Sequence, residues 1–153
     1  MTNWKDGTQN MVYNGRIKVP YLWNVGAIGS RFLKGLRDKK EIWGVRCPQC
    51  QKVYVPPVKT CGECFVPTQE WIQVQDTGTL ESYTIVRYAS DAQPSSTTPL
   101  AFGLIKLDGA DGALLHLLGG LNLDKLSLRM RVKAVFADQR TGSIMDIKYF
   151  APA

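Results

Sequence analysis

Four cysteines, arranged as two closely spaced pairs, are the residues of this sequence best suited to chemistry. Cys47 and Cys50 enclose two residues, as do Cys61 and Cys64, and ten residues separate the pairs. A CxxC turn directs two sulfurs to one place, and ten residues are enough for a short hairpin that brings the second turn beside the first. Four thiolates are a preferred tetrahedral ligand set of zinc. The spacing therefore predicts a rubredoxin-like zinc ribbon that binds one zinc ion through Cys47, Cys50, Cys61 and Cys64.

A site with four cysteine ligands is coordinatively closed. It leaves no position for water or substrate, so the metal is expected to stabilise structure and not to hydrolyse a bond. Iron suits the same ligands, which leaves a rubredoxin-like electron carrier as an alternative. All four cysteines fall within 18 residues, a pattern of metal ligation in a reducing compartment, so we expect a cytoplasmic protein.

Other residues offer little for catalysis. The metal site uses every cysteine, which excludes a free thiol nucleophile. The one histidine is His116, which alternation places on the same strand face as Leu114 and Leu118. A hydrogen-bonded or edge-exposed histidine is the favoured interpretation, and a base or donor beside a ligand is the alternative. Glycine-rich phosphate motifs and paired carboxylates do not stand out, so the chain itself is predicted to be non-catalytic.

The net charge of +6 is concentrated before the ribbon. Residues 1–46 contain nine Lys or Arg against three Asp or Glu, whereas the later segments are neutral. A positive segment attracts nucleotide phosphates, nucleic acid or an acidic protein surface. A solvated helix face is the competing explanation for the same residues.

The composition is that of an ordinary globular protein, with 44% hydrophobic and 21% charged residues. The longest apolar stretches fall far short of the ~20 residues that a membrane helix needs, so no membrane association is expected. The N-terminus has no basic stretch followed by an apolar core, and we therefore expect no signal peptide.

The order of elements along the chain predicts a mainly β protein with N-terminal helices. Residues 1–20 are polar and form an expected extended arm, and residues 21–42 form a helical segment. The helix, predicted over 21–40, could break near Gly29-Ser30 into two short helices because glycine weakens helices. A zinc ribbon follows over 43–69. Short strands are expected at 41–46 and 52–57, the second ended by a double proline.

The last segment, 70–153, is predicted to be a five-stranded OB-fold barrel. Short strands separated by turn signals favour a small barrel, and about 80 residues fit an OB-fold. The first strand runs near 70–76 and could merge with the second. The remaining strands are expected at 78–88, 100–107, 113–118, 131–137 and 144–150.

At this point the order of motifs resembles a known family. The sequence GSRFLKGLR (29–37) leads to WGVRCPQC (43–50), then VYVPP (53–57), CGEC (61–64) and a barrel ending in YFAP (149–152). This order resembles the acyl-CoA-associated family of thiolase-partner proteins. Members have an N-terminal helical hairpin, a rubredoxin-like zinc ribbon and a C-terminal OB-fold. The resemblance covers about residues 21–152 and extends to the zinc-finger subunits of benzoylsuccinyl-CoA thiolases.

The resemblance implies an accessory subunit. Such chains assemble with a thiolase-fold subunit that holds the catalytic cysteine, and they can contribute to the channel for CoA. The implied reaction is CoA-dependent cleavage or formation of a β-ketoacyl-CoA, with CoA or acyl-CoA shared with the partner. We expect Arg31, Lys34 and Arg37 to contact CoA phosphates through charge-assisted hydrogen bonds. The apolar residues of the same helix would pack it on the ribbon, the barrel or the partner: Phe32, Leu33 and Leu36.

The sequence departs from the family pattern in two places, and one alternative function is compatible with it. Arg129 stands where the family usually has glycine before Met-x-Val, which puts the turn geometry there in question. The arm at 1–20 is no family signature and could be a partner-specific docking segment. A single-stranded nucleic-acid binder using ribbon and barrel is the alternative function. Nucleic acid is disfavoured, because the barrel segment is neutral and the basic excess lies elsewhere.

Overall fold

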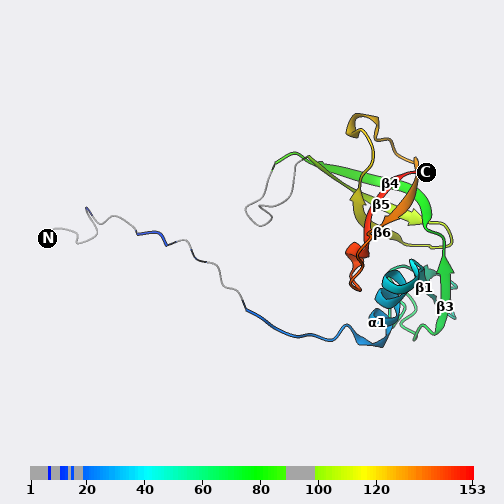
Figure 1. Ribbon diagram of the computed structural model, residues 1–153. Helices are drawn as coiled ribbons and strands as arrows, with labels where there is room; N and C mark the ends of the chain where they lie inside the picture. Colours follow the sequence, from blue (N-terminus) through cyan, green and yellow to red (C-terminus); the bar gives the residue numbers. More distant parts are fainter. Residues whose placement is uncertain (1–6, 8–10, 14, 16–18, 89–98) are drawn as a thin grey trace.

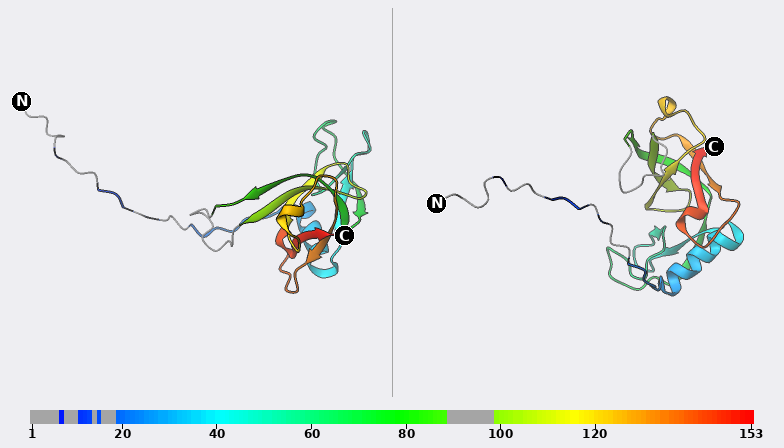
Figure 2. Two further views of the ribbon diagram at one scale, coloured as in Figure 1. Left: turned by 90° about the horizontal axis from the view of Figure 1, so that it is seen from above. Right: turned by 60° about the vertical axis from the view of Figure 1, so that its left-hand side comes forward.

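The computed structural model describes residues 7, 11–13, 15, 19–88 and 99–153, arranged as a small three-stranded sheet beside a closed five-stranded barrel. Figure 1 shows the barrel above the helix and the small sheet, and Figure 2 shows the same arrangement from two further sides. The predicted fold class is confirmed, with one α-helix in the described chain. The predicted arm, 1–20, lies mostly outside the described residues.

The helix is shorter than predicted. It begins as α1 (Gly26–Lys34) and continues as one π-helical turn, η1 (Gly35–Lys39). The predicted start at residue 21 is wrong, because Gly26 has φ +72° and Asn24 Oδ1 accepts its N–H at 2.7 Å. The chain thus reaches α1 through a turn, and not along a helix. The described residues contain one helix where the family resemblance implied a hairpin.

The expected break at Gly29-Ser30 is also wrong, since α1 runs through both residues. The winding changes instead at Gly35, where a Cβ atom would lie 2.8 Å from Trp43 Cδ1. Glycine there lets the helix approach Trp43 closely. The turn closes through Glu41, whose N–H donates to the Gly35 carbonyl at 3.1 Å, and Lys40 leaves it in the left-handed region at φ 57°.

The small sheet contains β1 (Ile42–Arg46), β2 (Val53–Tyr54) and β3 (Glu70–Val74), in the order β2-β1-β3. The strand expected near 70–76 was assigned to the barrel segment, and that assignment is wrong. It lies in the small sheet, where β3 pairs antiparallel with β1 from Ile42↔Val74 to Arg46↔Glu70. Two residues separate β3 from the next strand, so the two strands do not merge.

The barrel contains β4 (Thr77–Val86), β5 (Leu100–Leu107), β6 (Ala113–Leu118), β7 (Arg131–Phe136) and β8 (Ile147–Pro152). The strand order is β4-β5-β6-β8-β7. All neighbours are antiparallel except β6 and β8, which close the barrel in parallel through the single pair Leu118↔Phe150. The interior is filled by alternate residues that are fully buried: Leu80, Ile105, Val132, Ile147 and Phe150.

Short 3-10 turns interrupt the last part of the chain at η2 (Leu123–Lys125) and η3 (Ile144–Asp146). The final strand therefore starts at Ile147 and not at the predicted residue 144. The reason is Asp146, whose carboxylate accepts the backbone N–H groups of Thr141, Gly142 and Ser143. These bonds wind the chain into a capped turn before the strand begins.

The helix, the small sheet and the barrel share one apolar core, to which Phe32, Leu36 and Ile42 contribute from the N-terminal side. Two polar contacts reinforce this junction. Val53 N–H donates to Asp111 Oδ2 at 2.8 Å, and Arg140 Nε donates to the Arg37 carbonyl at 2.7 Å. The basic helix and the cysteine turns are consequently held at fixed positions on the barrel.

Arg129, the departure from the family pattern, has a left-handed backbone with φ 64°. Its N–H donates to the Leu80 carbonyl at 2.7 Å, which holds the turn against β4. Left-handed backbone costs a residue with a Cβ roughly 1–2 kcal/mol, part of which glycine loses again in chain entropy. We expect Arg129→Gly to raise the free energy of unfolding by about 0.5–1 kcal/mol in urea titrations. Arg129→Ala keeps the Cβ and is the control. Equal stability of the two variants would contradict this explanation.

Candidate metal centre

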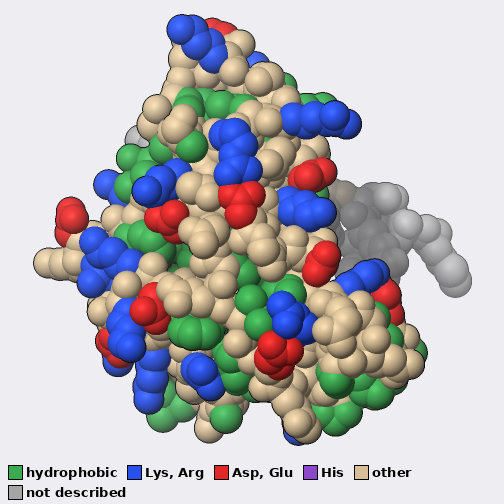
Figure 3. Space-filling view, turned by 90° about the vertical axis from the view of Figure 1, so that its right-hand side faces the viewer, with side chains coloured by type: hydrophobic (Ala, Val, Ile, Leu, Met, Phe, Trp, Pro, Cys, Tyr) green, Lys and Arg blue, Asp and Glu red, His purple; other side chains and the backbone are tan. Residues whose placement is uncertain are grey.

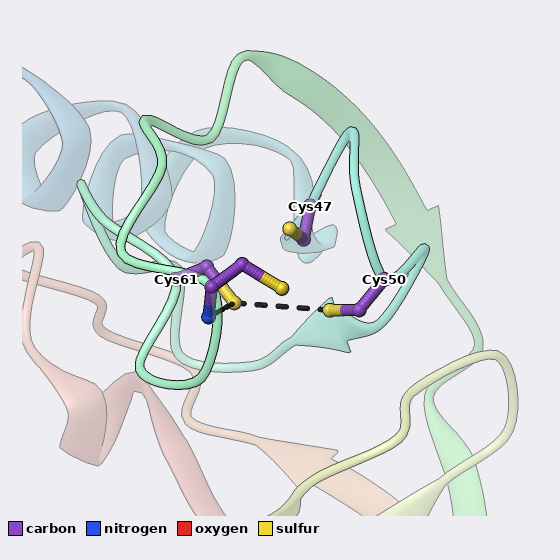
Figure 4. Close-up of side chains that lie close together, drawn as sticks. Cys47, Cys50 and Cys61 are labelled. Atoms are coloured by element: carbon purple, nitrogen blue, oxygen red, sulfur yellow. Dashed lines mark hydrogen bonds between the residues drawn. The ribbon is translucent and has the colours of Figure 1, made fainter.

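The four cysteines converge on one point of the small sheet. Their sulfur atoms all lie within 4.8 Å of one another, and Cys50 Sγ lies 3.7 Å from Cys61 Sγ. Figure 4 shows Cys47, Cys50 and Cys61 directed toward a shared space. Zinc with Zn–S bonds of about 2.3 Å places its sulfurs about 3.8 Å apart in a tetrahedron. The sulfur atoms of the cluster are therefore spaced nearly as a tetrahedral zinc site requires.

Two matching turns position the sulfurs. In each pair, the residue after the second cysteine adopts a left-handed backbone, with φ 63° at Gln51 and 57° at Phe65. The N–H of that residue donates to the carbonyl of the first cysteine, at 3.0 Å to Cys47 and 3.1 Å to Cys61. Each turn thus folds both of its sulfurs to the same side. The repeated geometry is typical of the paired knuckles of a zinc ribbon.

The surroundings of Cys61 favour a thiolate. The Tyr54 hydroxyl lies 3.2 Å from Cys61 Sγ, and Cys64 N–H donates to the same sulfur at 3.4 Å. These hydrogen bonds, the one from Tyr54 first, lower the pKa of the Cys61 thiol to about 6. Burial raises the pKa of Cys64 to about 12. A metal ion would offset this burial, because a coordinating thiol is deprotonated by the ion itself.

The donor set fits the metal that the ribbon implies. Four sulfurs in a tetrahedral cluster suit zinc, with iron as the other ion of this chemistry. Cys47 and Cys61 are fully buried, and Cys50 and Cys64 are half-buried. The arrangement supplies four ligands from protein alone, so such an ion would hold the two turns together.

The structure brings together two of the three basic residues predicted to contact CoA. Arg31 and Lys34 line a shallow pocket of about 230 Å³ together with Lys39 and two acidic residues, Asp38 and Glu41. Arg37 does not line this pocket, and its Nε pairs with Asp38 Oδ1 at 2.7 Å. Lys39 was missed because residues five apart become neighbours only in a π-helical turn, which the sequence spacing did not indicate.

Aromatic rings hold Arg31 in place. Its guanidinium carbon lies 4.3 Å from the centroid of the Trp71 ring and 5.5 Å from that of Trp43. Trp43 is fixed in turn by a hydrogen bond from Nε1 to Glu41 Oε2 at 3.1 Å. Stacking orders a guanidinium without using all its donors. Arg31 is therefore preorganised at the edge of the pocket.

A comparison with known proteins gives a family match in the barrel segment. Residues 71–137 match the family model described as ChsH2, C-terminal OB-fold domain. This part of the chain is therefore similar to the ChsH2 OB-fold domain. Two solved structures share the fold. One is a chain of the Ltp2-ChsH2(DUF35) aldolase, with TM-score 0.65 and 18% identity, covering 84% of this chain and 96% of that one. The other is a DUF35-family protein of unknown function from Sulfolobus solfataricus, with TM-score 0.58 and 27% identity, covering 72% and 78%.

His116 lies inside the OB-fold barrel. It is buried on the same face of β6 as Leu114 and Leu118, as alternation predicted. Its Nδ1 accepts the Leu117 N–H at 2.8 Å, so the proton resides on Nε2, which lies 3.2 Å from the Ile144 carbonyl. Both ring nitrogens are thus hydrogen-bonded within the fold.

The OB-fold should lose stability on mild acidification through His116. Burial holds the His116 pKa below its ordinary 6.5. Below pH 6.5 the unfolded chain gains a proton at His116 that the folded chain does not, so the free energy of unfolding should fall. The chain has one histidine, so a proton NMR titration can follow it directly. We expect a midpoint below 6.5, and a midpoint at or above 6.5 would contradict this prediction.

Asp108 titrates in a lower pH range than His116. The Arg131 guanidinium and the Thr77 hydroxyl hold its pKa at about 2, below its ordinary 3.8. Its stabilising effect is present above pH 3.8 and is lost toward pH 2, so it does not interfere with the His116 titration.

Proposed function

We propose that this chain is the non-catalytic, zinc-binding subunit of a thiolase-type acyl-CoA acyltransferase complex. The observation that carries the proposal is a ChsH2-type OB-fold joined to a four-cysteine cluster that takes up every cysteine of the chain. A thiolase reaction needs a cysteine nucleophile, which must then come from the partner. The aldolase whose chain this one resembles in fold likewise joins a DUF35 chain to another component, Ltp2.

The proposed reaction is CoA-dependent cleavage or formation of a β-ketoacyl-CoA by the thiolase-fold partner, in the cytoplasm. This chain helps to assemble the complex, and its zinc fixes the ribbon on which the basic helix is seated. Benzoylsuccinyl-CoA, from anaerobic aromatic degradation, is the substrate that we propose on the sequence resemblance. The partner contributes most of the acyl pocket, and this chain contributes to the path of the CoA moiety.

The pocket beside α1 is the proposed contact for CoA phosphates. Its three cations, Arg31, Lys34 and Lys39, outnumber its two acidic residues. The stacked position of Arg31 reduces the entropy lost when it binds an anion. Arg37 is not among the lining residues and pairs with Asp38. It remains a proposed secondary contact that would have to exchange its carboxylate for a phosphate.

The rival function, binding of single-stranded nucleic acid, needs a basic groove that follows a strand backbone. On the face shown in Figure 3, Lys and Arg side chains alternate with Asp and Glu. Five ion pairs among the described residues distribute charge in the same mixed manner. We therefore keep to a ligand with few phosphates, such as CoA.

The first test is purification of the tagged chain from its native cytosol, with mass spectrometry and metal analysis of the same eluate. The proposal expects a thiolase-sized partner in stoichiometric amount and zinc near one per chain. A chain recovered alone, or with nucleic acid, would reject the partnership. A red, iron-containing sample would favour the electron carrier.

The proposed CoA contacts are tested in the reconstituted complex. Arg31→Ala with Lys34→Ala should weaken CoA binding about tenfold or more, because a hydrogen bond to a charged group contributes about 1.5–3 kcal/mol. Lys106→Ala with Lys125→Ala removes the same charge from exposed barrel positions and is the control. Calorimetric titration with CoA measures both. Equal affinities for the two double variants would remove these contacts from the proposal.

A further inference from the structure

The chain before α1 exposes an unusual density of apolar side chains. We call residues 19–23 the docking segment. Val19 is 65% exposed, Tyr21 75%, Leu22 103% and Trp23 72%. Figures 1 and 2 show this part of the chain running away from the folded body. Large apolar groups gathered in one exposed place mark an interaction site more often than chance exposure.

The docking segment continues into a hollow on the folded body. The hollow has a volume of about 310 Å³ and is lined by residues of the first turn of α1 and by Lys59 from the ribbon: Val25, Gly26, Ala27, Ile28 and Lys59. Its lining is apolar apart from Lys59. The ion pairs found among the described residues do not include Lys59. The site thus fits an apolar group that has a carboxylate beside it.

The end of the docking segment is joined directly to α1. Asn24 joins it to the start of α1 through its hydrogen bond to the Gly26 N–H. The helix itself is fastened to the core by Phe32 and Leu36, which are 3% and 0% exposed. A partner that held the segment would therefore lie close to α1.

We propose that the docking segment and this hollow form the interface with the catalytic partner subunit, which presents an apolar groove with a carboxylate opposite Lys59. The inference rests on the proposed function and adds the surface that performs the assembly. A second copy of the chain fits less well, because each copy carries a net charge of +6. Five of its described carboxylates, moreover, are already paired with its own cations. Like-charged partners repel, whereas an acidic rim on the partner would attract Lys59.

The test uses the full chain and the partner identified by co-purification. Replacing Tyr21, Leu22 and Trp23 together by serine should weaken binding at least about 100-fold, since aromatic anchors dominate interface energies. These side chains are exposed, so the free chain should keep its circular dichroism spectrum. Leu104→Ser with Leu115→Ser, at exposed positions of the barrel, is the matched control. Biolayer interferometry compares the three proteins.

Two further measurements assign the surface. Lys59→Glu should weaken binding about tenfold or more if a carboxylate faces it, and Lys59→Met should weaken it less. A photoreactive p-benzoyl-phenylalanine at position 22 should cross-link to the partner, whereas the same group at position 104 should not.

The outcomes separate the two proposals. If the wild-type chain binds no thiolase-type subunit, the proposed function fails and the docking assignment falls with it. If the wild-type chain binds and the triple variant binds equally well, only the docking assignment is overturned. Loss of self-association in the triple variant, measured by sedimentation equilibrium, with partner binding unchanged would instead identify a second copy as the occupant and overturn the proposal.

Discussion

Replacing Cys47 with serine is expected to abolish stable metal binding and to unfold the ribbon. Cys47 is fully buried, and its N–H donates to the Lys52 carbonyl at 2.9 Å within the first turn. Structural zinc sites contribute on the order of 10–16 kcal/mol in small peptides, comparable to the ~5–15 kcal/mol stability of a whole domain. Zinc content should therefore fall from one per chain to below about a tenth. NMR resonances of β1, β2 and β3 should lose their dispersion.

A neighbouring substitution controls for this experiment. Gln49 is exposed in the same turn, so Gln49→Ser should leave zinc content and spectrum unchanged. Chelation of the wild-type chain should reproduce the effect of Cys47→Ser, and added zinc should reverse it only in the wild type. Full zinc occupancy and an unchanged melting temperature in Cys47→Ser would contradict a structural role for the cluster.

The second large effect is expected from Leu36→Ala. Leu36 is 0% exposed and joins the helical segment to the shared core. Truncating a buried leucine removes its packing and leaves a cavity, which lowers the free energy of unfolding by about 2–5 kcal/mol. Urea titration followed by tryptophan fluorescence measures the change. We also expect weaker CoA binding in the complex, because η1 carries Lys39 at the pocket.

Leu22→Ala is the matched comparison, since the same side chain is 103% exposed there. It should change the stability of the free chain by less than about 0.5 kcal/mol. A similar loss in both variants would mean that Leu36 does not pack as described.

The clustering of the four cysteines and most of the barrel strands were predictable because both are local signals. The CxxC spacing needs only turn chemistry, and alternation within β6 correctly placed His116 on the buried face. The assignment of β3 was not local. Its sequence is compatible with a strand in either sheet. Its pairing with β1, some 28 residues earlier, determines that it belongs to the small sheet.

The basic pocket shows the same limit. Arg31 was identified from its position on the helix, but Trp71 lies on β3 and becomes its neighbour only in the folded chain. Lys39 lies in the π-helical turn that begins at Gly35, where the chain packs closely against Trp43. Contacts between side chains that are distant in sequence depend on how the core assembles. Helical spacing rules describe neighbours within one helix and therefore cannot predict such contacts.

The single parallel pair between β6 and β8 has a consequence for how the barrel forms and opens. The β4–β5 and β5–β6 pairs join strands close in sequence through long antiparallel ladders, whereas Leu118↔Phe150 alone connects β6 to β8. Contacts distant in sequence form late because their loops must first be closed. The pairing of β6 with β8 should therefore form last and open first. The amide groups of Leu118, Gly119 and Phe150 would then exchange with deuterium before those of the β4–β5–β6 meander.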